Sequence, residues 1–302
     1  MSPTGQRVAR MPDPFAYEQL QVNGTDITTA VAGEGEPLLL LHGYPQTHLV
    51  WRHVAPALAQ RYTVVVTDLR GYGDSGKPAP DAEHTLYSKR ALAEDQLAVM
   101  RHYGFERFGL VGHDRGARVA HRLTLDHPDA VTRLALLDII PTRHLLTHVD
   151  HAMASAHFHW WFLAAGGGIP EGLLAAEPEF WIRAMTERLL APGATIEPDV
   201  MTEYIRCFSD PATIAATCAD YRAGAATDLD HDNASAEAGQ KLAPPTLVLW
   251  GEASSFVAKG YEPMSVWDEY AADLRGTQLP GGHFLPEEIP ARITQELLDF
   301  LS

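Results

Sequence analysis

The sequence predicts an α/β protein in which a mostly parallel sheet is flanked by helices and interrupted by one long helical insertion. Short aliphatic runs alternate with helical periodicity along the first 140 or so residues. This alternation is typical of strand–helix–strand units with right-handed crossovers. It then stops for roughly 100 residues, which is the size of a small domain, and resumes near the C-terminus.

Five runs are predicted to be buried parallel strands, because each is short, rich in leucine or β-branched residues, and bounded by turn residues. They are residues 37–41, 62–69, 108–111, 133–139 and 246–250. A further short strand is expected shortly before residue 283. Helical periodicity predicts helices over residues 51–60, 89–103, 117–127 and 287–301.

Residues 142–242 are rich in His, Trp and Ala and are mostly helical in period. We therefore expect residues 1–141 and 243–302 to form one core domain, and residues 142–242 to form a helical cap over the carboxyl edge of the sheet. Ligands bind at that edge in open α/β sheets. A helical extension that packs elsewhere on the core is the alternative.

Composition excludes several classes of function. The 302 residues are 46% hydrophobic and 21% charged, as in soluble globular proteins, and no apolar run approaches the roughly 18 residues of a membrane span. A net charge of −16 argues against a nucleic-acid partner. Cys207 and Cys218 do not form a disulfide framework. Residues 1–14 lack the apolar core of a secretory signal, so a cytoplasmic location is expected.

The strongest motif is Gly112-His113-Asp114-Arg115-Gly116, which lies between a predicted strand and a predicted helix. It has the spacing of the nucleophile elbow G-x-S-x-G, with aspartate in place of serine. The same pattern also occurs in ordinary turns, but its position between strand and helix favours the elbow. Asp114 is therefore the candidate nucleophile.

A histidine and a second acid follow in the order that this fold requires. His283 lies in a loop before the last helix, and Asp138 ends a predicted strand among aliphatic residues. A buried carboxylate needs a partner, and an imidazole N–H is a suitable one. The alternative acid is Glu252, after the strand at 246–250. We favour Asp138.

An aspartate nucleophile limits the reactions that the protein can be expected to catalyse. A carboxylate that attacks an ester would form an anhydride, whereas one that attacks a saturated carbon with a leaving group forms an alkyl ester that His283 and water can hydrolyse. The backbone N–H groups of Tyr44, after the first predicted strand, and of Arg115 are expected to form the oxyanion hole. Alkyl halides and epoxides are the substrate classes that fit.

Along its whole length the chain resembles the α/β-hydrolase superfamily, and its elbow resembles the dehalogenase and epoxide-hydrolase branch. The segment DLRGYGDS at 68–75 is shared by both groups. Haloalkane dehalogenases and most epoxide hydrolases have tryptophan after the nucleophile, whereas this chain has Arg115. With Arg118 and the segment GHFLPEE at 282–288, the sequence is similar to fluoroacetate dehalogenases.

This resemblance implies a haloacid substrate, release of a halide ion, no cofactor and a homodimer. Arg115 and Arg118 would bind the substrate carboxylate, since guanidiniums three residues apart on a helix face the same way. Arg115 could instead pair with an acid, and Arg118 could form a surface ion pair. By the same resemblance His159, Trp160 and Tyr221 would receive the halide, because each offers an N–H or O–H donor.

Two other functions remain open. An epoxide hydrolase would use the same nucleophile, with Tyr204 and Tyr221 as proton donors, although the missing tryptophan and the paired arginines weigh against it. A ligand-binding relative without turnover would usually lack part of the triad. His144 and His148 stand four residues apart, but the glutamate of the H-E-x-x-H motif is absent. No metal is expected.

Overall fold

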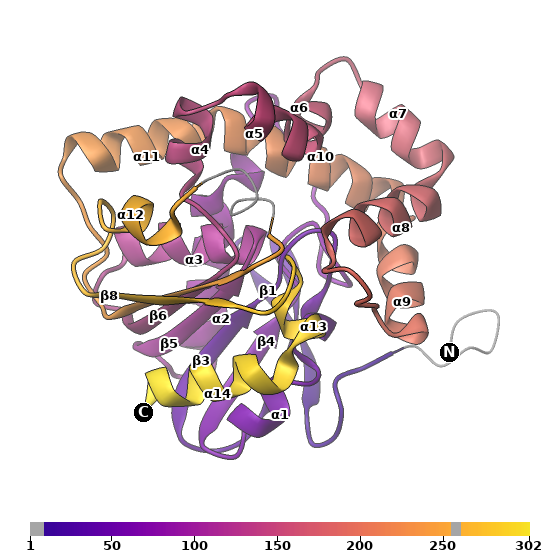
Figure 1. Ribbon diagram of the computed structural model, residues 1–302. Helices are drawn as coiled ribbons and strands as arrows, with labels where there is room; N and C mark the ends of the chain where they lie inside the picture. The colour runs from indigo at the N-terminus through magenta and orange to yellow at the C-terminus, as the bar shows by residue number, and fades with distance from the viewer. Residues whose placement is uncertain (1–8, 255–260) are drawn as a thin grey trace.

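The structure is a computed structural model that describes residues 9–254 and 261–302. Residues 1–14 were considered above as a possible secretory signal, and residues 1–8 of that stretch lie outside the described residues. Figure 1 shows a twisted central sheet with helices on both faces and a group of helices above one edge. None of the helices formed by the described residues is long and apolar enough to cross a membrane.

Within the described residues the sheet has eight strands, in the order β1-β2-β4-β3-β5-β6-β7-β8. Strands β3 to β8 pair in parallel, and β1 and β2 add an antiparallel edge. Their bounds are β1 Ala16–Val22, β2 Thr25–Ala32, β3 Glu36–Leu41, β4 Tyr62–Thr67, β5 Phe108–His113, β6 Val131–Leu137, β7 Thr246–Gly251 and β8 Leu274–Leu279. The α/β architecture and the five predicted parallel strands are confirmed.

The β1–β2 hairpin is absent from the predictions. β1 has the sequence AYEQLQV and is largely exposed, so it lacks the continuous apolar character by which the central strands were recognised. Those strands are covered by helices on both faces, and parallel strands covered in this way are almost uniformly apolar. Residues 38–41 of β3, for example, are completely buried.

The predicted helices at 89–103 and 117–127 correspond to α2 (Lys89–His102) and α3 (Arg115–Asp126). Two other helix predictions were wrong in detail. Residues 51–60 contain only the end of a short 3-10 helix, η1 (His48–Trp51), and the single turn α1 (Ala55–Leu58). The C-terminal helix divides into α13 (Leu285–Glu288) and α14 (Pro290–Leu301), because proline at the first position of α14 has no N–H to continue a preceding helix.

The long insertion between β6 and β7 is helical, as predicted. Its helices, which we call the inserted helices, are α4 (Thr142–Thr147), α5 (His151–Ala156), α6 (Phe158–Ala164), α7 (Ile169–Ala176), α8 (Pro178–Leu189), α9 (Pro198–Phe208), α10 (Pro211–Ala225) and α11 (Thr227–Glu237). In Figure 1 most of them lie above the sheet, α8 and α9 continue down its right-hand side, and α14 and α1 lie below it. Helix α12 (Pro263–Trp267) follows β7.

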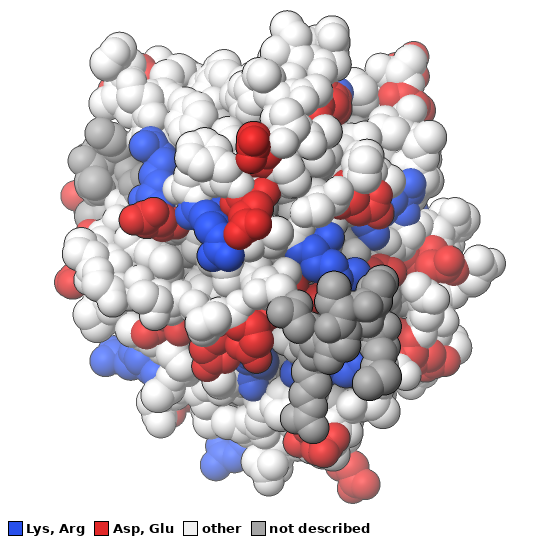
Figure 2. Space-filling view, turned by 90° about the vertical axis from the view of Figure 1, so that its right-hand side faces the viewer, with Lys and Arg blue, Asp and Glu red and all other residues white. Residues whose placement is uncertain are grey.

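The surface carries charges of both signs. On the face shown in Figure 2, acidic and basic side chains are interspersed and no continuous basic area is visible.

Candidate active site

Asp114 lies at the junction of β5 and α3 in a strained backbone conformation, with φ 46° and ψ −116°. Positive φ is costly for a residue with a side chain, so it persists only where the surroundings enforce it. The flanking glycines allow this close packing. A Cβ on Gly116 would lie 2.4 Å from the carbonyl oxygen of His42, and one on Gly112 would lie 2.5 Å from Cα of Ala117. The motif therefore has the geometry of a nucleophile elbow.

The Asp114 carboxylate is buried and accepts a hydrogen bond of 2.8 Å at Oδ2 from the backbone N–H of Tyr44. Burial alone would raise its pKa, but the nearby His283, His113 and Arg118 outweigh burial and lower the pKa to about 2. Asp114 is therefore ionised at neutral pH. The second predicted oxyanion donor, the N–H of Arg115, belongs to the first turn of α3, where N–H groups lack intrahelical acceptors.

The His283 ring lies between the two aspartates and is hydrogen-bonded to one of them. Its Nδ1 lies 2.6 Å from Oδ2 of Asp138, and its Nε2 lies 3.9 Å from Oδ1 of Asp114. A carboxylate partner requires the proton on Nδ1, which leaves Nε2 free to act as a base. Burial opposes the imidazolium form, but the hydrogen bond and charge of Asp138 and the charge of Asp114 outweigh burial and raise the pKa of His283.

Asp138 directly follows β6 and is completely buried. Besides His283 it accepts hydrogen bonds from the N–H of Gly251 at 3.1 Å and the hydroxyl of Ser254 at 3.0 Å. The alternative acid, Glu252, is exposed. Ser254 was missed because a single serine after a strand carries no distinctive pattern.

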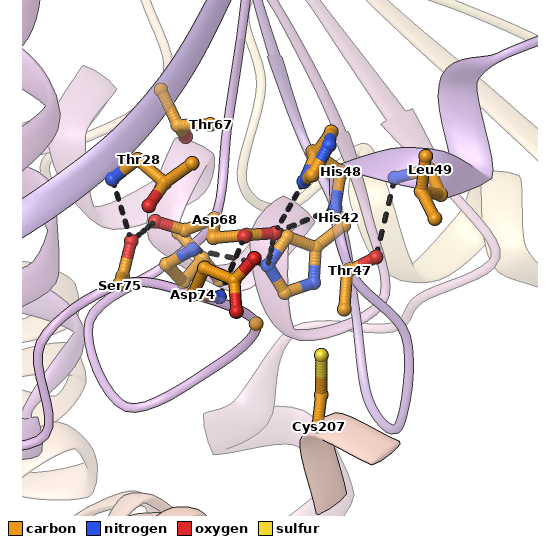
Figure 3. A network of polar contacts seen from close by, with 12 residues as sticks. Thr28, His42, Thr47, His48, Leu49, Thr67, Asp68, Asp74, Ser75 and Cys207 are labelled. Atoms are coloured by element: carbon orange, nitrogen blue, oxygen red, sulfur yellow. Dashed lines mark hydrogen bonds and ion pairs between the residues drawn. The ribbon is translucent and has the colours of Figure 1, made fainter. Parts of the chain in front are cut away.

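The segment 68–75 supports the loop that carries Tyr44. Asp68 accepts two hydrogen bonds of 2.8 Å from His48, one from its N–H and one from Nδ1. His42 accepts the N–H of Leu69 at Nε2, at 3.0 Å. Figure 3 shows both histidine rings on the loop directed toward Asp68. Residues at both ends of the Tyr44 loop are thus bonded to this segment.

The two arginines differ in their surroundings. Arg118 lines the cavity beside Asp114, and its Nη1 donates to the carbonyl of Ile140 and the hydroxyl of Thr142, each at 2.9 Å. Its Nε and Nη2 are buried without an acceptor among the described residues. Burial and the neighbouring Arg115 lower the pKa of Arg118 to about 10. A desolvated guanidinium with unused donors favours an anionic ligand.

Arg115 is paired with an acid, as the alternative interpretation allowed. Its Nε donates to Oδ2 of Asp220 and its Nη2 to the backbone carbonyl of Asp220, each at 2.8 Å. Asp220 is completely buried and also accepts from the hydroxyl of Tyr72 at 2.8 Å and from Lys89. Arg115, Lys89 and their hydrogen bonds outweigh burial and lower the pKa of Asp220. No sequence pattern had indicated Asp220.

The three predicted halide donors come from the inserted helices and line the same cavity as Asp114 and His283. His159 and Trp160 lie on α6, and Tyr221 lies on α10. Trp160 is 8% exposed and its neighbour Trp161 is 40% exposed, so Trp160 faces the cavity. Burial lowers the pKa of His159 to about 3, with a smaller contribution from His157. His159 is therefore neutral.

The cavity itself is small. Its volume is about 20 Å³, which is close to the space that one water molecule needs. The other lining residues are Tyr44, Arg118, His157 and Leu189. Tyr204 does not line it, because its hydroxyl donates to Oε1 of Glu287 at 2.6 Å. Polar donors therefore surround a space that fits only a few atoms.

His144 and His148, which were considered for metal binding, do not line this cavity. The rings of His144 and His148 stack with their centroids 4.2 Å apart. Across residues 9–254 and 261–302, no group of three or more His, Cys, Asp or Glu side chains is arranged to hold a metal ion. Cys207 and Cys218 are buried free thiols.

The fold and the elbow agree with the sequence comparison. Residues 36–288 match the α/β-hydrolase fold family, and the chain belongs to that family. It is 43% identical to the fluoroacetate dehalogenase of a Burkholderia species over 95% of this chain and 94% of the relative. It is 33% identical to the soluble epoxide hydrolase of Corynebacterium sp. strain C12, over 97% of this chain and 99% of that protein. A crystal structure of a protein from Nostoc sp. PCC 7120, described as an α/β hydrolase, superposes with a TM-score of 0.93 at 49% identity, covering 96% and 98% of the two chains.

Proposed function

We propose that this protein is a hydrolytic dehalogenase of short haloacids, with fluoroacetate as the first substrate to test. One observation carries the proposal: Arg118, a buried guanidinium with two unused donor groups, lines the same small cavity as the ionised Asp114. A haloacetate has both a carboxylate for the guanidinium and a carbon–halogen bond for the nucleophile. The 43% identity to a fluoroacetate dehalogenase supports the same activity.

In the first step a carboxylate oxygen of Asp114 attacks the halogen-bearing carbon. A carbon–oxygen bond forms, the carbon–halogen bond breaks, and its electron pair leaves with the halide. His159, Trp160 and Tyr221 donate N–H or O–H groups to the departing ion. Fluoride is small and strongly hydrated, so these donors have to replace its water.

In the second step Nε2 of His283 takes a proton from water, and the hydroxide oxygen adds to the Asp114 carbonyl carbon. The N–H groups of Tyr44 and Arg115 stabilise the oxyanion. The ester bond then breaks, glycolate leaves with the proton from His283, and Asp114 retains one oxygen from water and loses the second proton of that water to solvent. Asp138 keeps the imidazole in the required tautomer.

The two arginines would have different roles. We propose that Arg118 contacts the substrate carboxylate directly with Nε and Nη2, which together match a carboxylate in fork geometry. Arg115, held by Asp220, adds positive charge to the carboxylate site. In the same proposal residues 142–242 form a cap domain over a core of residues 1–141 and 243–302, and the enzyme is a cofactor-free cytoplasmic homodimer.

The test is ion chromatography of halide released from fluoroacetate and chloroacetate. Wild type is expected to release halide, and Asp114→Asn to release at least about 1,000-fold less, as for other nucleophile replacements. Asp299→Asn, on the exposed side of α14, is the matched control. Intact mass of His283→Ala after incubation with haloacetate should show a carboxymethyl ester. Absence of both halide and ester would overturn the proposal.

The second candidate is an epoxide hydrolase, which the relationship to the Corynebacterium enzyme favours. Its proton donors would be the hydroxyls of Tyr204 and Tyr221, but Tyr204 is bonded to Glu287 and does not line the cavity. Styrene oxide and fluoroacetate, assayed for diol and for free fluoride, separate the two functions. Diol without fluoride would favour the epoxide hydrolase.

A further inference from the structure

One carboxylate joins the inserted helices to the loop of residues 280–284, which carries His283 and which we call the histidine loop. Oε2 of Glu288 accepts the backbone N–H groups of Gly282 and Ala191, each at 2.9 Å. Oε1 accepts the N–H of Phe284, also at 2.9 Å. Gly282 and Phe284 flank His283, whereas Ala191 follows the end of α8. A single side chain therefore satisfies backbone donors from two segments that lie far apart in the sequence.

Two further contacts join the same segments. The backbone N–H of His283 donates to the carbonyl of Leu189, the last residue of α8, at 2.9 Å. The backbones also touch at Gly282, where a Cβ would lie 2.4 Å from the nitrogen of Ala191. Leu189 lines the cavity together with His283. The end of α8 is thus part of the wall that faces the imidazole.

A carboxylate is a suitable acceptor for the backbone N–H groups at this position. Backbone N–H groups removed from water need acceptors, and hydrogen bonds to an ionised acceptor are stronger than those between neutral groups. Three such donors converge on the half-buried Glu288. Since Asp138 holds the ring of His283 at Nδ1, Glu288 fixes the backbone from which that ring projects.

We propose that Glu288 is a positioning residue for His283 and that it ties the histidine loop to the C-terminal end of α8, so that the two segments move as one unit. The proposal rests on the proposed function for its kinetic consequence. Alkylation of Asp114 does not use His283, whereas hydrolysis of the ester does. Loss of Glu288 should therefore slow the second step and spare the first.

The test compares Glu288→Gln with Glu296→Gln. The first variant keeps the shape of the side chain but places an NH2 group against a backbone N–H. The second removes the same charge from α14, where Glu296 forms an ion pair with the exposed Arg292. In Glu288→Gln, first-turnover halide release should stay within about 2-fold of wild type, while steady-state turnover falls about 10-fold or more, the effect of losing a hydrogen bond to a charged group. The esterified fraction of Asp114, measured by intact mass, should rise.

Equal losses in both steps would indicate a merely structural role and overturn the kinetic part of the proposal, as would turnover equal to that of Glu296→Gln. Amide hydrogen exchange provides a readout that does not depend on activity. In Glu288→Gln the amides of Ala191, Gly282 and Phe284 should lose protection together. If only Gly282 and Phe284 lose protection, the proposal that Glu288 ties the histidine loop to α8 is wrong. A wild-type protein that releases no halide would overturn the proposed function, while hydrogen exchange would still decide whether the tie exists.

Discussion

Nε2 of His283 lies 3.9 Å from Oδ1 of Asp114, although Nδ1 of the same ring is bonded to Asp138 at 2.6 Å. The longer distance exceeds that of a hydrogen bond. The imidazole is therefore anchored on the side of Asp138 and unbonded on the side of the nucleophile. This asymmetry is what a base that activates water requires, because Nε2 must be free to accept a proton from a molecule beside Asp114.

Asp138→Asn should lower the turnover of haloacetate by about 10,000-fold, because an amide no longer selects the imidazole tautomer with the proton on Nδ1. The carboxymethyl ester on Asp114 should accumulate, and intact mass after substrate addition measures it. Glu252→Gln is the matched control, since Glu252 is exposed on the neighbouring loop. Equal losses in the two variants would contradict the assignment of Asp138.

The pKa of His283 should differ between the free and the esterified enzyme. The Asp138 bond and the charges of Asp138 and Asp114 raise the pKa of free His283 above its ordinary value of 6.5, against the opposing effect of burial. Only the neutral imidazole can accept a proton, so ester hydrolysis should increase as pH rises through the pKa that His283 has in the esterified enzyme. In the ester, Asp114 has lost its charge, and one cause of the raised pKa is gone. The pKa of His283 in the esterified enzyme is therefore expected to be lower than in the free enzyme.

Two measurements check this order. NMR titration of His283 in the free enzyme gives one pKa, and single-turnover hydrolysis of the ester against pH gives the other. A hydrolysis profile with its midpoint at or above that of the free enzyme would show that the charge of Asp114 does not contribute.

Arg118→Lys should raise KM for chloroacetate about 10- to 100-fold, because an ammonium group cannot replace two guanidinium donors aimed at one carboxylate. Chloroacetamide, which has no carboxylate, should be affected much less. Steady-state kinetics with both substrates measures the difference. Arg292→Lys, on the exposed side of α14, is the control, and equal effects on the two substrates would argue against carboxylate recognition.

Trp160→Phe should reduce defluorination more than dechlorination, because the indole N–H is lost and fluoride depends most on hydrogen-bond donors. We expect turnover of fluoroacetate to fall at least about 10-fold, as when one preorganised donor is removed, with a smaller effect on chloroacetate. Trp161→Phe is the internal control, since Trp161 is 40% exposed. Halide-specific electrodes distinguish the substrates. A similar loss on both would indicate that Trp160 only packs.

The parts of the molecule that have a distinctive local sequence pattern could be predicted from the sequence. The uniformly apolar strands and the glycine-flanked Asp114 are patterns that backbone geometry imposes on the sequence, so strands β3 to β7 and the elbow could be predicted. Strand β1 was missed because it is exposed and lacks an apolar pattern. The break before Pro290 was missed because it depends on the missing N–H of one residue, which a pattern over many residues does not reveal.

The site was predictable to a similar degree. Asp114, Asp138 and His283 were chosen as candidates because each lies at a boundary between elements, and the structure places these candidates close together. The partner of Arg115 could not be predicted, because Asp220 lies 105 residues away and comes near only after α10 packs over the sheet. Glu288 was visible as part of a motif, but its hydrogen-bond partners at 191, 282 and 284 exist only in the folded chain.

The small volume of the cavity beside Asp114 limits when water can reach the reacting atoms. The cavity has room for about one water molecule, which is less than a haloacetate needs, so the side chains that line it have to move apart when substrate binds and leave little space for a water beside it. The water that hydrolyses the ester would occupy space vacated by the departing anion. A fit this tight would also keep solvent away from the carbon–halogen bond until the ester has formed.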